Sequence, residues 1–286
     1  MPRSRHVQSR LDRGGQGRSR FRPSVYGAVT LGVLLAVSGA MLGRDSGRAQ
    51  DARSGETRLV WKGDYESGDF SQWERILRED ESPGTARIVR RPLAQGRYAA
   101  RFTLGPQTRF TGSRIEAHQG DVETSGGLYG SEAWYRWAEF IPSGSSFARH
   151  RSFNHVVQWH PNVPCFGAAL SVNGLARPVR LVFNVRGGEI VRFGGSCELQ
   201  YDRAWDLGPL RRDRWLRFRL HIKWSADPNE GFVELWMNGG RKIPLTHVAT
   251  AAPGVGHYVR QGLYRFRCNC RTLVYGDGMT VKQVGS

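Results

Sequence analysis

The residues best suited to chemistry stand in a short stretch, QWHP at positions 158–161. Val156 and Val157 come directly before it, and β-branched and aromatic residues followed by a proline are typical of a short β-strand. Side chains alternate between the two faces of a strand, so Gln158 and His160 share a face. An amide that donates hydrogen bonds and an imidazole that takes up a proton near neutral pH suit acid–base catalysis. A histidine that merely ends a strand is the structural alternative.

Polar residues also alternate in two other predicted strands. Arg114 and Glu116 are separated by one residue, and Arg260, Gly262 and Tyr264 occupy alternate positions. Each set therefore shares one strand face, and three strands could present these groups to a common concave surface. Two structural alternatives stay open: Arg114 and Glu116 as an ion pair on an outer face, and Tyr264 as a core residue with its hydroxyl at the rim.

The elements that must position these residues are short strands separated by turns. Glycine is abundant, with 36 residues, and turn signals stand at 82–84, 187–188, 227–231 and 238–240. The predicted strands span residues 58–61, 86–90, 98–104, 112–117, 132–141, 156–160, 168–172, 179–185, 189–193, 215–224, 231–237, 262–267 and 272–281. No long helical period and no internal repeat are visible. The pattern predicts an all-β, two-sheet sandwich of the jelly-roll (concanavalin-like) type with few short helices.

One predicted strand, residues 215–224, shows the alternation over its whole length. Its apolar face, which we assign to the core, carries Leu216, Phe218, Leu220, Ile222 and Trp224. Its other face carries Arg217, Arg219, His221 and Lys223 and is either a solvated outer face or part of a cationic binding surface. Trp134 and Trp137 are assigned to the core rather than to a sugar-stacking platform, and His155 and His221 to structural or surface positions.

The chain begins with a segment that does not belong to the predicted domain. Residues 1–23 form a basic flank, and residues 25–43 form an apolar run that is long enough to span a bilayer. A basic flank followed by an apolar run is typical of an export signal, either cleaved near Ala49 or retained as an anchor. We therefore take residues 24–50 as a signal peptide or signal anchor with a short linker. Residues 51–286 are expected outside the cytoplasm as one β-domain.

Four cysteines, Cys165, Cys197, Cys268 and Cys270, fit an oxidising compartment. Their spacing lacks a zinc-ribbon pattern, and no metal site is predicted. A Cys165–Cys197 disulfide is favoured because each residue lies near a strand edge of the same predicted meander, whereas a Cys268–Cys270 bridge would be tight; the pairing stays open. Asp277 belongs to a turn or to a calcium site, and one acidic residue does not establish a metal.

The charge balance indicates a polyanionic partner. The formal net charge is +17, of which residues 1–50 contribute +7, so the predicted domain carries +10. Acidic polysaccharide, nucleic acid and anionic membrane are all attracted by such a surface. No feature of the sequence other than the positive charge favours nucleic-acid binding. We therefore expect no nucleic-acid partner and assign the surface to an acidic polysaccharide. The protein is expected to be a monomer.

Several short motifs follow one another across the predicted domain. They are DYESGDFSQW at 64–73, RIE at 114–116, WYRW at 134–137 leading to IP at 141–142, QWH at 158–160, KWS at 223–225, GFVELWMNG at 231–239 and GLYR at 262–265. In this order, over residues 60–280, they resemble the heparin-lyase-like polysaccharide lyases, jelly-roll enzymes related to glucuronan and alginate lyases. Each motif alone has low specificity, and the ordered set points to the superfamily rather than to a substrate.

The resemblance implies cleavage of a uronic-acid polysaccharide by β-elimination, without addition of water. It also implies that a histidine and a tyrosine transfer the protons, at the positions of His160 and Tyr264. Related heparin lyases place a substrate-binding lysine four residues before the tyrosine. This chain has Arg260 there, which keeps the charge but changes the geometry and argues against a heparin-specific substrate.

The chemistry explains why such residues are needed. β-Elimination removes the C5 proton of a uronate and expels the oxygen at C4, so the site must neutralise the carboxylate and stabilise the developing charge. Gln158 and Arg114 are candidates for that task, and Arg260 and Glu116 complete the predicted substrate-binding set. His160 can act as base, and Tyr264 can protonate the leaving oxygen or, as a tyrosinate, serve as base instead. The choice depends on the C5 configuration of the sugar.

Two other carbohydrate functions fit the same fold. A non-catalytic carbohydrate-binding module would use the arginines and aromatic residues but would not need His160 and Tyr264 together. A glycoside hydrolase would need a pair of opposed carboxylates, and the chain has no motif of the Glu-x-Asp-x-x-Glu kind. The lyase is therefore the preferred hypothesis, and the binding module is the alternative.

Overall fold

The computed structural model describes residues 56–79, 84–149, 154–165, 167–193 and 196–285, and all regular structure in these ranges is β-strand. The strands are β1 (Thr57–Gly63), β2 (Arg75–Arg78), β3 (Gly84–Val89), β4 (Ala99–Leu104), β5 (Gln107–Gln119), β6 (Glu132–Phe140), β7 (Asn154–Pro161), β8 (Ala168–Asn173), β9 (Arg180–Phe193), β10 (Ser196–Pro209), β11 (Trp215–Lys223), β12 (Phe232–Met237), β13 (Gly240–His247), β14 (His257–Cys268) and β15 (Thr272–Val284). Residues 51–286 form one compact unit. The predicted β-sandwich is confirmed, whereas the few short helices expected are not found among the described residues.

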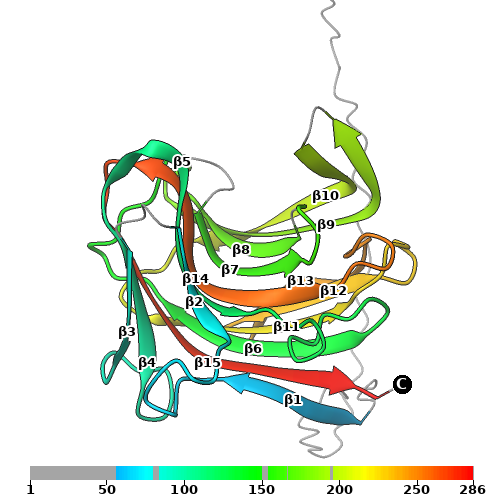
Figure 1. Ribbon diagram of the computed structural model, residues 1–286, viewed down its shortest axis with the longest axis horizontal. Coiled ribbons are helices and arrows are strands. Elements are labelled where there is room, and N and C mark those ends of the chain that lie inside the picture. Colours follow the sequence, from blue (N-terminus) through cyan, green and yellow to red (C-terminus); the bar gives the residue numbers. More distant parts are fainter. Residues whose placement is uncertain (1–55, 80–83, 150–153, 166, 194–195, 286) are drawn as a thin grey trace, which may run out of the picture. The chain divides into compact units, whose positions relative to one another are not determined.

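The strands form two antiparallel sheets (Figure 1). One has eight strands in the order β13-β12-β11-β6-β15-β4-β3, with β1 also paired to β15, and we call it the outer sheet. The other has seven strands in the order β10-β9-β8-β7-β14-β5-β2. In Figure 1 this second sheet bends upward at β5 and β14 on one side and at β9 and β10 on the other. We call the face inside this bend the concave face.

The core lies between the sheets because each strand turns its apolar set inward. Trp159 of β7 is fully buried. Its ring packs edge-on against two rings of the outer sheet, with centroid distances of 5.2 Å to Tyr135 and 5.3 Å to Trp137. Leu216, Phe218, Leu220 and Ile222 of β11 are also buried, as the alternation predicts. Trp159 therefore anchors the strand whose opposite face carries Gln158 and His160.

The sequence-based predictions are wrong about one turn and miss three strands. The turn predicted at 187–188 does not exist, because β9 runs through it. A Cβ at Gly187 would lie 2.5 Å from the backbone of Ala249, and Gly188 has a φ of 84° at a register shift against β10. These glycines allow a close backbone approach and a bulge rather than a reversal. Strands β2, β10 and β13 were also not predicted.

The two tryptophans of β6 lie on opposite faces of the outer sheet. Trp137 is in the core, as predicted, with 2% of its surface exposed. Trp134 is three residues earlier and lies half-buried on the outer face, so its assignment to the core is wrong. Strand alternation requires this difference, because residues an odd number of positions apart point to opposite faces.

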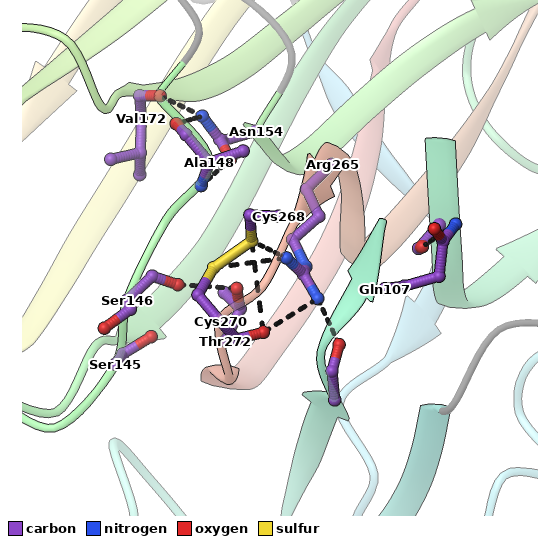
Figure 2. Close-up of a disulfide and its surroundings, with 12 residues drawn as sticks. Gln107, Ser145, Ser146, Ala148, Asn154, Val172, Arg265, Cys268, Cys270 and Thr272 are labelled. Atoms are coloured by element: carbon purple, nitrogen blue, oxygen red, sulfur yellow. Dashed lines mark hydrogen bonds between the residues drawn. A yellow bond between two sulfur atoms is a disulfide. The ribbon is translucent and has the colours of Figure 1, made fainter. Parts of the chain in front are cut away.

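The cysteines at the end of β14 form a disulfide between Cys268 and Cys270. Figure 2 shows the fully buried Arg265 beside it, where the guanidinium contacts both sulfurs and donates to the carbonyl oxygens of Gly105 and Cys270. The tight bridge considered in the sequence is thus the one that the structure forms. Cys165 is disulfide-bonded as well. The side chain of Cys197 lies outside the described residues, so its pairing with Cys165 stays a prediction.

Gly262 lets β14 approach β5, and its replacement gives a direct test of the fold. It has a φ of 143°, and a Cβ there would lie 2.5 Å from the backbone oxygen of Ile115. We expect Gly262→Ala to lower the free energy of unfolding by about 1–3 kcal/mol, because a non-glycine residue is strained in this conformation. Thermal unfolding measures the loss. Gly144→Ala is the matched control, since Gly144 has open space around it; equal melting temperatures for the two variants would contradict the argument.

The membrane segment predicted at residues 25–43 lies outside the described residues. Within the part of the chain that is described, no helix is long and apolar enough to cross a membrane.

Candidate active site

The predicted site residues meet on the concave face where β5, β14 and β7 lie side by side. Arg114 and Glu116 come from β5, Arg260 and Tyr264 from β14, and Gln158 and His160 from β7. The register places Gln158 opposite Arg260 and Glu116 opposite Gly262. The three local alternations seen in the sequence therefore become one continuous polar surface.

His160 lies in a cluster at one end of this surface. Its Nδ1 is 2.7 Å from the carbonyl oxygen of Pro161 and 3.0 Å from the hydroxyl of Tyr258. A carbonyl can only accept, so Nδ1 carries the proton of the neutral ring and Nε2 keeps its lone pair. Arg260 donates from Nη2 to the Tyr258 hydroxyl at 2.7 Å and from Nε to Nδ1 of His118 at 3.1 Å. These contacts fix His160 with its basic nitrogen unprotonated.

Tyr264 lies in a separate cluster toward the other end. The guanidinium carbon of Arg114 is 4.0 Å from the centre of its ring, and the ring of His155 is 6.0 Å away on the neighbouring strand. His155 Nδ1 in turn contacts the hydroxyl of Ser171 at 2.7 Å. The register thus forms two histidine–tyrosine pairs, His160 with Tyr258 and His155 with Tyr264.

A buried carboxylate connects the two clusters. Glu116 is completely buried, accepts a hydrogen bond from Gln158 Nε2 at 2.5 Å, and pairs with Arg114 Nε at 3.1 Å. Arg114 and Glu116 are therefore an ion pair on the concave face, not on an outer face. Glu116 and Gln158 contact each other and are nearly inaccessible, and the carboxylate of Glu116 also holds Arg114.

Burial and the arginines set the protonation states. Burial lowers the pKa of His160 to about 4, and the charge of Arg260 adds to the effect. Burial likewise lowers the pKa of His118 to about 4, again with Arg260 contributing. Burial raises the pKa of the Tyr264 phenol above its ordinary value, although the charge of Arg114 opposes the rise. At neutral pH the surface therefore offers a neutral imidazole and a protonated phenol.

Two residues of the site were missed in the sequence, Tyr258 and His118. Each continues an alternation that the sequence analysis follows only in part: His118 follows Glu116 by two residues, and Tyr258 precedes Arg260 by two. Extending each polar alternation to the end of its strand would have found both. His155, which the sequence analysis assigns to a structural or surface position, also lies on this face.

Asp277, the candidate for a calcium site, is not part of this surface. Asp277 is buried in β15, where its carboxylate accepts hydrogen bonds from the backbone of Ala94 at 2.8 Å and Gln95 at 3.1 Å. Among the described residues, no group of three or more His, Cys, Asp or Glu side chains is arranged to hold a metal ion.

Comparison with known proteins identifies the class of enzyme. The model of the polysaccharide lyase family matches residues 65–280, which include every candidate site residue. The chain belongs to this family. The match is to polysaccharide lyases in general, so the broader part of the resemblance is confirmed and its heparin-lyase part is not. A search of curated proteins gives no match.

Three solved lyase structures resemble this chain. An endo-β-1,4-glucuronan lyase from the fungus Trichoderma reesei has a TM-score of 0.63 at 20% identity, covering 78% of this chain and 95% of its own. The alginate lyase vAL-1 from a Chlorella virus has a TM-score of 0.49 at 11% identity, covering 79% and 100%. The alginate lyase AlyC3 has a TM-score of 0.47 at 14% identity, covering 65% and 75%. At these identities the glucuronan lyase establishes a shared sandwich fold.

Proposed function

We propose that this lyase cleaves an anionic uronic-acid polysaccharide by β-elimination on the concave face of its seven-stranded sheet. The observation that carries the proposal is the joint placement of a neutral imidazole, a protonated phenol and two arginines on three neighbouring strands. β-Elimination from a uronate needs a base, an acid and neutralisation of the carboxylate.

Arg260 and Arg114 would bind the carboxylate. Arg260 Nη1 is buried and has no hydrogen-bond partner among the described residues, while its other nitrogens hold Tyr258 and His118. A buried donor without a partner is costly, and a substrate carboxylate would satisfy it. Arg114 is held by Glu116 and lies over Tyr264, beside the proposed acid. Arginine here fits two parallel hydrogen bonds better than lysine would.

His160 would take the C5 proton on Nε2. The C5–H electrons then form the double bond to C4, and the C4–O bond breaks. Tyr264 would give its phenolic proton to the leaving oxygen, and transfer of the proton from His160 through solvent restores both groups. This step requires the side chains of His160 and Tyr264, which face different partners across β7 and β14, to reach the same sugar ring. Tyr258 would orient His160, because its hydroxyl already contacts His160 Nδ1 and accepts from Arg260. Glu116 and Gln158 would position the arginine and the strands.

The proposal assigns charge neutralisation to arginine and requires no cofactor. It favours a glucuronan- or alginate-type polymer over heparin, because Arg260 stands where the heparin-lyase resemblance expects lysine. We expect the enzyme to be a monomer, and the predicted export signal would place it outside the cytoplasm. A non-catalytic carbohydrate-binding module remains the alternative: it would use the same arginines without elimination.

The deciding experiment follows the ultraviolet absorbance of the new double bond conjugated to the carboxylate. The full chain is incubated with glucuronan, alginate, hyaluronan, heparan sulfate and heparin in the presence of a metal chelator. We expect a rise with one uronate polymer. Measurable binding to a polymer without any rise would favour the binding module and would remove the catalytic role of His160.

A further inference from the structure

The outer sheet carries an aromatic and cationic surface on the side of the sandwich away from the concave face. Trp134 of β6 and Trp236 of β12 reach toward each other across β11, and their rings lie 5.7 Å apart at an interplanar angle of 27°. Both indoles are partly exposed. Contiguous exposed apolar surface often marks a binding site, and this stacked pair of indoles is a candidate for one.

A buried histidine holds Trp134 in place. His221 lies opposite Trp134 on β11, and the two rings stack at 3.9 Å with an interplanar angle of 10°. Phe232 packs edge-on against His221 at 4.8 Å, and Glu132 contacts His221 Nε2 at 2.6 Å. One face of Trp134 is therefore covered by His221, which restrains the indole and lowers the entropic cost of binding a ligand.

Arg219 is the charged centre of the surface. Its guanidinium carbon lies 3.9 Å from the centre of the Trp236 ring and 5.0 Å from that of Trp134. Arg136 lies directly opposite Arg219 on β6, and like charges at facing positions of neighbouring strands repel. Lys282 of β15 adds a third cation, opposite Trp134.

Among the ion pairs of the described residues, none includes Arg136, Arg219 or Lys282. The two carboxylates nearby are already engaged, Glu132 by His221 and Glu234 by Arg241. An anionic ligand would relieve the repulsion between the two arginines, and a guanidinium held against an indole presents its N–H groups to a carboxylate.

We propose that Trp134, Trp236, Arg219, Arg136 and Lys282 form a second, non-catalytic binding site for the uronic-acid polymer, which we call the outer tryptophan site. The indole faces would stack on the C–H faces of the sugar rings, and the cations would pair with uronate carboxylates. The inference rests on the proposed anionic substrate, and the positive charge matches that polymer. Such a site would hold long chains near the enzyme without contacting the reacting sugar.

Affinity electrophoresis tests the site separately from catalysis. The full chain with His160→Ala is run through gels containing polyglucuronate or alginate, with and without Trp134→Ala and Trp236→Ala together. We expect the double replacement to weaken retention of the chain at least about tenfold, the scale on which truncation of central tryptophans lowers affinity at interfaces. Trp215→Ala, also on the outer face of β11, is the matched control and should leave retention unchanged. Arg219→Gln is a milder variant that keeps both indoles.

The outcomes separate the two proposals. With His160 intact, the double variant should keep the kcat/KM of wild type on a short oligosaccharide. Retention that depends on the tryptophans without elimination of any polymer would reject the proposed reaction and keep the site. Elimination with unchanged retention would reject the site. If double-stranded DNA competed equally well, the outer tryptophan site would be an unspecific cationic patch. If the double variant changed from dimer to monomer in sedimentation without a change in retention, the surface would be a contact between copies. Either result overturns the proposal.

Discussion

Replacing His160 by alanine is expected to lower kcat/KM on the preferred uronate polymer by about 10²–10⁴-fold, the usual contribution of a positioned general base. The reason is the fixed orientation of the ring: Nδ1 faces the carbonyl of Pro161, so Nε2 is the nitrogen available to a C5 proton. Initial rates from the ultraviolet absorbance measure the loss. Retention on the polymer should persist in the variant, because the arginines remain.

The matched control is His155→Gln, on the same strand and, because the register shifts between His155 and Val157, on the same face. His155 contacts Ser171 and faces Tyr264, so we expect a loss of no more than about tenfold, from altered positioning. Losses of equal size in the two variants would contradict the assignment of the base to His160.

The pH profile offers an independent check of the same residue. Since burial and Arg260 lower the pKa of His160 to about 4, the imidazole stays neutral well below its ordinary range. The acid limb of kcat/KM, which reports the free enzyme, should therefore fall near pH 4. A fall near pH 6.5, the ordinary pKa of histidine, would show that the base lies in a different environment.

Replacing Tyr264 by phenylalanine is the second change with a large expected effect, a loss of about 10²–10⁴ in kcat. Burial raises the pKa of this phenol, so it is a proton donor at neutral pH, and Arg114 over its ring places the acid beside a carboxylate-binding group. The phenylalanine keeps the ring and its packing, so folding should be unaffected. Thermal unfolding of the variant provides that control.

Tyr258→Phe distinguishes the two tyrosines of β14. The Tyr258 hydroxyl already contacts His160 and accepts from Arg260, which is the position of an orienting group. We expect a loss of about tenfold, in the range for a single orienting hydrogen bond. If Tyr258→Phe instead abolished elimination and Tyr264→Phe did not, the acid would be Tyr258, and His160 and Tyr258 would act as a directly paired couple.

The local pattern of the sequence predicted which residues share a face. Gln158 with His160, Arg114 with Glu116, and Arg260 with Tyr264 each lie two positions apart, and all three pairs lie on the concave face. The apolar face of β11 was predicted for the same reason. Residues two positions apart in an extended strand point the same way whatever the rest of the chain does, so this information is local.

The sequence by itself thus determined the all-β class, the polar strand faces and the polysaccharide lyase family, without the heparin-lyase part of the resemblance. Only the tertiary structure decided which residues meet across strands: Tyr258 with His160, His118 with Arg260, and Trp134 with Trp236 across β11. It also showed that the glycines at 187–188, which were predicted as a turn, form a bulge within β9. Register and strand order depend on contacts between residues far apart in the chain, and a shift by one residue would turn every side chain to the opposite face. No local pattern carries that information.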